Sequence, residues 1–147
     1  MKLTKTVDYG LRLILFLGQQ TQLVSMPKVS ETLNIPYNNL IKIVSKLSKA
    51  GLITTSQGKF GGIQLALPAS DLNLLRVVEA IDGPIALLHC LDQNSNKVAP
   101  CTFICSCSLK GVFSTLQTQM KDYLGNVYVS DVGQFPKLEK EVSYVRN

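Results

Sequence analysis

Residues 27–67 contain two short helical segments followed at once by a glycine-tipped hairpin, and this order restricts the fold more than any other feature. The first helix is expected to begin after Ser25, which can cap it. Pro27 then falls in the first turn, where its missing N–H group costs nothing. This helix is expected to end near Asn34.

The second helix opens at Pro36 and has two different faces. Its apolar residues follow the i, i+3, i+4, i+7 spacing of a helix packed on a core, and Gly51 ends it. The apolar stripe consists of Leu40, Ile43, Val44, Leu47 and Ala50. The opposite side carries Asn38, Lys42, Lys46 and Lys49, with Asn39 beside them. Such a face suits the major groove of DNA, although an ordinary solvated face has the same composition.

A period of two replaces the helical period after Gly51, which predicts a β-hairpin. Its tip consists of Gln57, Gly58, Lys59, Phe60, Gly61 and Gly62. Helix, turn, helix and hairpin in this order predict a winged helix-turn-helix, a mainly α fold with a small β-hairpin wing. In that fold the second helix presents side chains to base edges, while backbone amides and lysines hold phosphates. The glycine-rich wing after the lysine-bearing helix therefore favours DNA binding over a solvated face.

The basic charge is concentrated in the same half of the chain. Residues 1–70 hold eight Lys or Arg against two acidic residues, a net +6, whereas residues 71–147 hold seven against eight, a net −1. This asymmetry indicates that the basic surface lies with the wing. The chain has 147 residues, of which 46% are hydrophobic, so one domain with an appended element is expected.

The apolar run from Leu11 to Gly18 is expected to form a buried first helix rather than a signal sequence. The run is short, contains Arg12 and lacks a small-residue cleavage site. Thr6 can cap this helix. Asp8 then lies in the first turn, where the helix dipole stabilises a carboxylate by about 0.3 to 1 kcal/mol. The chain is therefore expected in the cytoplasm, with no membrane partner.

All the cysteines lie between Pro84 and Ser108, in a segment with a polar loop and little sign of regular structure. They are Cys90, Cys101, Cys105 and Cys107. In a reducing cytosol such residues indicate metal binding or redox chemistry rather than disulfides. Zinc fits poorly, even with His89 as a nitrogen ligand, because no CxxC pair is present. Iron–sulfur clusters tolerate this irregular spacing better, and packed reduced thiols are the alternative.

A helix that Asn73 can cap and Gly83 can end precedes the cysteines, and a longer apolar stripe follows them. The stripe contains Leu109, Val112, Phe113, Leu116, Met120, Tyr123 and Leu124. Its length predicts a dimerisation helix. The expected organisation is a DNA-binding region at 1–70, a helix and cysteine-containing sensor loop at 71–108, and a dimerisation helix with a C-terminal tail at 109–147.

Four stretches of the chain form a specific combination, namely TKTVDYGLRLILFL, LIKIVSKLSKAGLI, GKFGGIQLA and CTFICSCSLK. In this combination the chain resembles the Rrf-type winged-helix regulators over roughly residues 1–125. Within that family it is most similar to the nitric-oxide-sensing NsrR repressors. The IscR branch places a histidine where this chain has Lys110, and the CymR branch lacks the cluster cysteines, so neither matches as well.

The resemblance implies a homodimeric repressor that binds a palindromic double-stranded DNA operator and an iron–sulfur cluster. The NsrR pattern is a 4Fe-4S cluster held by three loop cysteines and an aspartate of the partner subunit, with a 2Fe-2S cluster as the alternative here. The matching positions are Cys90, Cys101, Cys107 and Asp8. The interval after Cys90 is longer than is usual in the family, so Cys105 is an alternative middle ligand.

DNA contacts are expected from the polar face of the second helix and from the wing. The residues concerned are Asn38, Asn39, Lys42, Lys46, Lys49, Gln57, Gly58 and Lys59. Relatives often carry Arg at the position of Gln57 and a polar base-reading residue at the position of Ile41. The DNA sequence recognised by this chain is therefore expected to differ from theirs.

Two other functions remain as alternatives. A regulator of the same fold that senses oxidants through the thiols of Cys105 and Cys107 would bind no iron. A zinc-stabilised protein-interaction module would show no salt-dependent affinity for DNA. An enzyme is not expected, because His89 is the only histidine and Gly58-Lys59 lacks the GxxxxGK[ST] spacing of a phosphate-binding loop.

Overall fold

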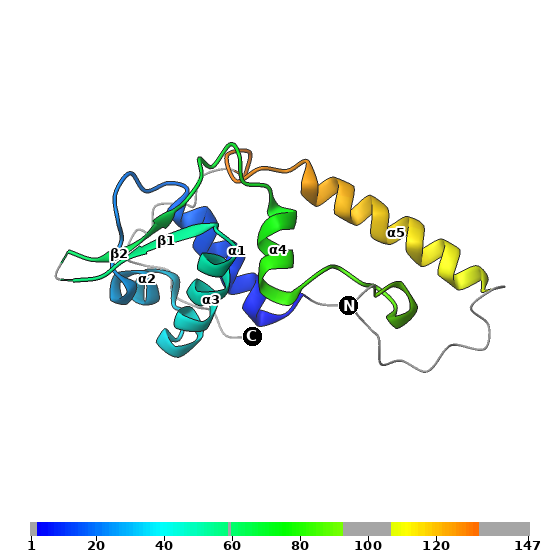
Figure 1. The fold of residues 1–147 in the computed structure, drawn as a ribbon, viewed down its shortest axis with the longest axis horizontal. Coiled ribbons are helices and arrows are strands. Elements are labelled where there is room, and N and C mark those ends of the chain that lie inside the picture. Colours follow the sequence, from blue (N-terminus) through cyan, green and yellow to red (C-terminus); the bar gives the residue numbers. More distant parts are fainter. Residues whose placement is uncertain (1–2, 59, 93–106, 133–147) are drawn as a thin grey trace, which may run out of the picture.

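The computed structural model describes residues 3–58, 60–92 and 107–132, and within them it contains five α-helices, one 3₁₀ turn and a two-stranded hairpin (Figure 1). The elements are α1 (Lys5–Leu17), α2 (Met26–Leu33), α3 (Tyr37–Lys49), β1 (Ile53–Ser56), β2 (Gly62–Leu65), α4 (Leu74–Asp82), η1 (His89–Leu91) and α5 (Ser108–Gly125). This confirms the predicted winged helix-turn-helix, with α2 and α3 as its two helices. Among the described helices none is both long and apolar enough to cross a membrane.

Local signals set most of the helix ends, with two differences from the sequence analysis. Ser25 precedes α2 as predicted, but its side chain makes no capping hydrogen bond. Pro27 lies in the first turn of α2, and the left-handed Asn34 (φ 50°) ends that helix. The cap of α1 is Thr4, not Thr6 as predicted, because the Thr4 Oγ1 accepts a hydrogen bond from the Val7 N–H at 3.2 Å. Thr6 is already inside the helix. Asp8 lies in the first turn, as expected.

Local signals also set both ends of α4, as predicted. The Asn73 side chain caps it by accepting a hydrogen bond from the Arg76 N–H at 3.0 Å, and Gly83 ends it with a φ of 85°. The segment after Pro84 was expected to lack regular structure, but residues 89–91 form the single turn η1.

The core lies between α1, α3 and α4, which pack against one another. The largest side chains with no more than 1% exposure are Leu13, Ile14, Ile35, Leu40, Ile43, Leu47, Leu52, Leu72 and Ile63. Four residues of the predicted α3 stripe are therefore buried, whereas its fifth member, Ala50, is the exposed C-cap of the helix. Gly10 is buried where α1 meets α4, and a Cβ atom at Gly10 would overlap the Cδ1 methyl of Ile81.

The wing is anchored to the link between α1 and α2. Strands β1 and β2 are antiparallel, with Ile53 opposite Leu65 and Ser56 opposite Gly62. The backbone of Val24 pairs with Ile63 on the other side of β2, with N···O distances of 3.0 and 2.9 Å. A Cβ atom on Gly62 would lie 2.6 Å from the Val24 carbonyl oxygen, so only glycine permits this approach.

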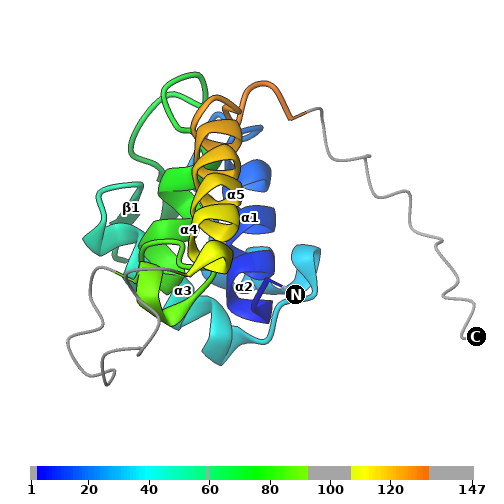
Figure 2. The ribbon, with the colours of Figure 1, turned by 90° about the vertical axis from the view of Figure 1, so that its right-hand side faces the viewer.

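Helix α5 extends away from the winged region (Figure 1), and Figure 2, viewed from the side opposite the wing, shows it in front of α4. Its C-terminal end is held because the following residues return to the core. The Leu74 N–H donates to the Val127 carbonyl and the Val129 N–H to the Leu72 carbonyl, each at 2.9 Å. Val129 is buried beside Gly18. The N-terminal end of α5, which follows the cysteine segment, is therefore the end remote from the wing.

The contact at Gly10 predicts a specific stability effect. Gly10→Ala should lower the free energy of unfolding by about 1 to 3 kcal/mol, because the buried Ile81 must move, although alanine is the better helix former. Ile81→Val removes the overlapping methyl and by itself should cost about 0.5 to 1.5 kcal/mol. In urea denaturation the double variant should therefore lose less stability than the sum of the two single changes. Strict additivity would show that α1 and α4 are not in close contact at this point.

Candidate functional site

The surface predicted to meet DNA is the exposed side of α3. Asn38, Asn39, Lys42 and Lys49 are all exposed, on the side of the helix opposite its buried stripe. The amphipathic period places them there, because the apolar residues of the same helix are held in the core. Two of these side chains are neutral and able both to donate and to accept hydrogen bonds, and two are cations.

A groove of about 470 Å³ lies beside this face of α3. Its walls are the start of α2, one side of α3 and the wing. It is lined by Ser25, Met26, Pro27, Ile41, Val44, Ser45, Thr55, Ser56, Gly58, Gly61, Gly62 and Ile63. The backbone reverses at Gly58, whose φ of 106° favours glycine. Gln57 and Gly58 are exposed at the tip, and Lys59 lies outside the described residues.

Lys46 has a partner inside the chain, which the sequence did not indicate. Its Nζ donates a hydrogen bond to the carbonyl oxygen of Ile81, in the last turn of α4. A lysine is well suited to this position, because the last carbonyls of a helix carry partial negative charge. Lys46 thus differs from Lys42, although both were assigned to the same face.

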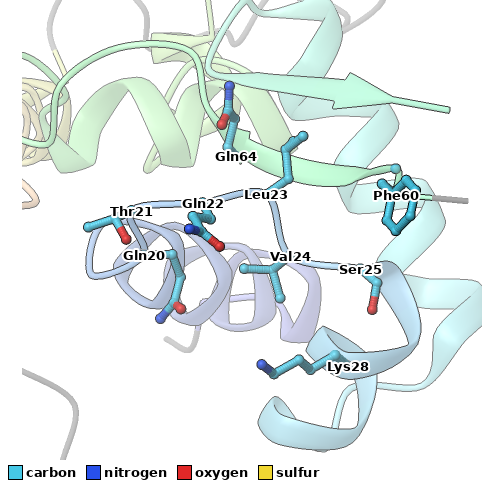
Figure 3. Close-up of a pocket in the computed structure, with 10 residues that line it drawn as sticks. Gln20, Thr21, Gln22, Leu23, Val24, Ser25, Lys28, Phe60 and Gln64 are labelled. Atoms are coloured by element: carbon cyan, nitrogen blue, oxygen red, sulfur yellow. The ribbon is translucent and has the colours of Figure 1, made fainter. Parts of the chain in front are cut away.

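A second hollow, of about 740 Å³, lies between the α1–α2 link, α2 and the wing (Figure 3). Its lining is Gln20, Thr21, Gln22, Leu23, Val24, Ser25, Lys28, Phe60, Gly61 and Gln64. This hollow is polar and open, and it contains none of the residues predicted to bind metal or DNA. It shares Ser25 and Gly61 with the groove beside α3.

Asp8, the predicted ligand from the partner subunit, is paired with Arg12 one turn later. The Arg12 Nη2 lies 2.8 Å from the Asp8 Oδ2, and both side chains are about half exposed, at 49% and 48%. The i, i+4 spacing of an acidic and a basic residue signals such a pair in the sequence. The turn that carries Asp8 is also tied to α4, because the Thr4 Oγ1 donates to the Asp82 Oδ2 at 2.6 Å.

Two of the cysteines are described, and both are free thiols. Cys90 is exposed in η1, and Cys107 is the half-buried N-cap residue of α5. Cys101 and Cys105 lie outside the described residues. η1 lies against α5, and the Leu87 N–H donates to the Gln117 Oε1 at 2.9 Å. No group of three metal-ligating side chains occurs in the part of the chain that the structure describes.

The apolar stripe of α5 divides into two faces. One face is half buried and carries the bonds to the rest of the chain, namely Gln117 to Leu87 and Lys121 to Glu79, the latter at 3.3 Å. The other face is exposed. It consists of Leu109 (64%), Val112 (64%), Leu116 (45%) and Tyr123 (72%).

Comparison with known proteins decides the family. Residues 3–134 match the family model described as "Rrf2: Iron-dependent Transcriptional regulator". The chain belongs to the Rrf2 family. It is a DNA-binding winged-helix transcription regulator and not an enzyme, as the sequence predicted.

Individual relatives agree with this assignment. The chain is 38% identical over 114 residues to the HTH-type transcriptional regulator NsrR of Shouchella clausii, which covers 76% of this chain and 74% of that protein. The protein of the same name from Halalkalibacterium halodurans is 39% identical over 114 residues, 76% of each chain. The solved structure named T. potens IscR has a TM-score of 0.70 at 19% identity and covers 89% of this chain and 85% of that one. At that identity the likeness concerns the Rrf2 fold alone.

Proposed function

We propose that the chain is a homodimeric repressor that binds a palindromic operator through α3 and the wing, and that senses nitric oxide through an iron–sulfur cluster. The observation that carries the proposal is the exposed polar face of α3 beside the wing groove, in a chain 38% and 39% identical to regulators named NsrR.

In this proposal α3 enters the major groove of the operator and the wing lies along the phosphate backbone. Asn38 and Asn39 reach base edges, since a carboxamide can donate and accept together. Lys42 and Lys49 hold phosphates, together with Lys59 and the backbone at Gln57 and Gly58. Lys46 is the exception among the predicted lysines, because a phosphate contact would compete with its bond to Ile81.

Affinity for DNA should therefore depend strongly on salt. With about eight phosphate contacts per dimer, the slope of log K against log salt concentration should be near −7. Lys42→Ala removes one contact from each subunit and should flatten that slope by roughly two, with little change in sequence preference. The measurement is a salt titration of operator binding.

Lys121→Ala is the matched control for Lys42→Ala. It removes the same charge from α5, where Lys121 is paired with Glu79 away from the proposed DNA face. Its slope should equal that of the parent protein. A slope that is unchanged in Lys42→Ala as well would show that Lys42 does not contact phosphate.

The exposed apolar face of α5 is the proposed dimer contact. Leu109, Val112, Leu116 and Tyr123 follow a spacing of three, four and seven residues, which keeps them on one side of the helix. A contiguous exposed apolar face of this kind marks a protein–protein contact. The half-buried face of the same helix is already occupied by α4 and η1.

Leu116→Asp should convert the dimer to monomer, because it would place a charge in an apolar interface. Thr118→Asp introduces the same charge at an exposed position on another side of α5 and should leave the dimer intact. Sedimentation velocity measures both. A dimer that survives Leu116→Asp unchanged would rule out this face as the subunit contact.

Cys90, Cys101 and Cys107 would hold the cluster together with Asp8 of the partner subunit, with Cys105 as the alternative middle ligand. Two observations support this donor set: the two described thiols are free, and they flank residues 93–106 in the chain. The Asp8 side chain is about half exposed, and its pair with Arg12 is worth only about 0.2 to 1 kcal/mol, so its carboxylate is released at small cost. A bound cluster would supply iron that reacts with nitric oxide, and a carboxylate binds that iron less firmly than a thiolate does.

In this proposal, two bonds within the chain link the start of α1, which carries Asp8, to the helix α3. Thr4 bonds Asp82 and Lys46 bonds the Ile81 carbonyl, so the first turn of α1 and the recognition helix α3 both meet the last turn of α4. A displacement of the helix turn that carries Asp8 would therefore shift the last turn of α4, and with it α3. Ligands contributed by both subunits would also let one chemical event change the spacing of the two recognition helices.

Ligand variants of the anaerobically purified protein test the cluster. Cys107→Ala should lose bound iron and sulfide. Asp8→Ala should retain much of both, but with an altered absorption spectrum and an altered nitric oxide titration. Arg12→Ala is the control, because it breaks the ion pair while keeping the carboxylate, and its spectrum should match the parent.

Two results would contradict this assignment. Spectra and titrations of Asp8→Ala identical to the parent would remove Asp8 from the site. Parent protein that binds its operator without iron, and releases it on mild oxidation, would instead support the thiol-based sensor.

A further inference from the structure

Ile41 is an exposed apolar side chain at the edge of the polar face of α3, where that face meets the groove beside the wing. It is 46% exposed, whereas Leu40, Ile43 and Val44 around it in the sequence are buried. Core packing therefore accounts for those neighbours and not for the exposed part of Ile41. The side chain lies on the wall of the groove that α3 shares with Thr55, Ser56 and Gly58 of the wing.

Most exposed neighbours of Ile41 on α3 are polar. The other large exposed apolar side chain of this helix, Tyr37 (45% exposed), lies four residues before Ile41 and carries a hydroxyl group. Asn38 lies one turn before Ile41, Ser45 one turn after it and Lys42 beside it, and all three are exposed. In a face that enters the major groove, these side chains have donors, acceptors and phosphates as partners. Ile41 has neither a donor nor an acceptor. The apolar group that base edges offer in the major groove is the C5 methyl of thymine.

We propose that Ile41 is a specificity-determining residue that contacts a thymine C5 methyl group, so that each operator half-site carries a thymine at the position facing Ile41. This inference rests on the proposed function, because it requires α3 to lie in the major groove. It assigns one base of the operator from one side chain. It also gives a role to an exposed side chain that has neither a donor nor an acceptor.

Deoxyuridine substitution tests the inference, because it removes only the methyl group and keeps the base pair. The full-length protein, purified anaerobically, would first be used to select its binding site from random duplex DNA. Each thymine of the selected site would then be replaced singly by deoxyuridine. One position in each half-site should lose affinity by about fourfold, and both together by about fifteenfold, as expected for one buried methyl group in each half-site.

Ile41→Ala should bind the thymine site more weakly and should abolish the difference between thymine and deoxyuridine at that position. Leu23→Ala is the matched control. It truncates another exposed apolar side chain, 40% exposed in the link between α1 and α2, and should keep the difference in full. Circular dichroism of both variants checks that they fold.

The outcomes separate this inference from the function on which it rests. Specific, salt-dependent binding with equal affinity for thymine and deoxyuridine at every position would overturn the role of Ile41 and leave the repressor intact. A deoxyuridine effect that persists in Ile41→Ala would assign the methyl contact to another residue. The absence of any sequence-specific binding would overturn the proposed function itself, and this inference with it.

Discussion

The close contact of α1 with α4 at Gly10 is the constraint on which the rest of the structure depends. Because Gly10 has no Cβ atom, the Cδ1 methyl of Ile81 fits against the backbone of α1. This brings the last turn of α4 within reach of Thr4 on α1 and of Lys46 on α3. Two helices, α1 and α3, thus bond to the end of a third, and the contact at Gly10 helps to position both α3 and the first turn of α1, which carries Asp8.

Helix α5 shows how one element can serve two kinds of contact. Gln117 and Lys121 bind it to its own chain, through the Leu87 N–H and through Glu79, while Leu109, Val112, Leu116 and Tyr123 stay exposed. A helix has room for both because its faces point in different directions. The end of α5 nearest the winged region is held by the return of Val127 and Val129 to the core. The N-terminal end of α5, which follows Cys107, therefore extends from a C-terminal end that is bonded to the core.

The sequence by itself determined the fold class and most of the elements. Pro27, Asn34, Asn73 and Gly83 act through their own backbone preferences or through hydrogen bonds within one turn, so their effect does not depend on distant residues. The buried stripe of α3 and the strands of the wing could also be predicted, because burial of one face imposes its period on the sequence. The misassigned cap of α1 shows the limit of such reading. Thr4 and Thr6 are both suitable residues two positions apart, and the choice was settled where Thr4 could bond both Val7 and Asp82.

Only the tertiary structure decided what the polar and apolar residues of a shared face do. Lys42 and Lys46 are one turn apart on α3, yet only Lys46 binds the Ile81 carbonyl, because α4 ends beside it. Likewise, the stripe of α5 is one run in the sequence, but α4 and η1 cover only part of it. Such contacts join residues far apart in the chain, and no local preference encodes them. The sequence thus determined which residues form each helix and which of them share a face. Packing determined which of these side chains make contacts within the chain and which remain exposed.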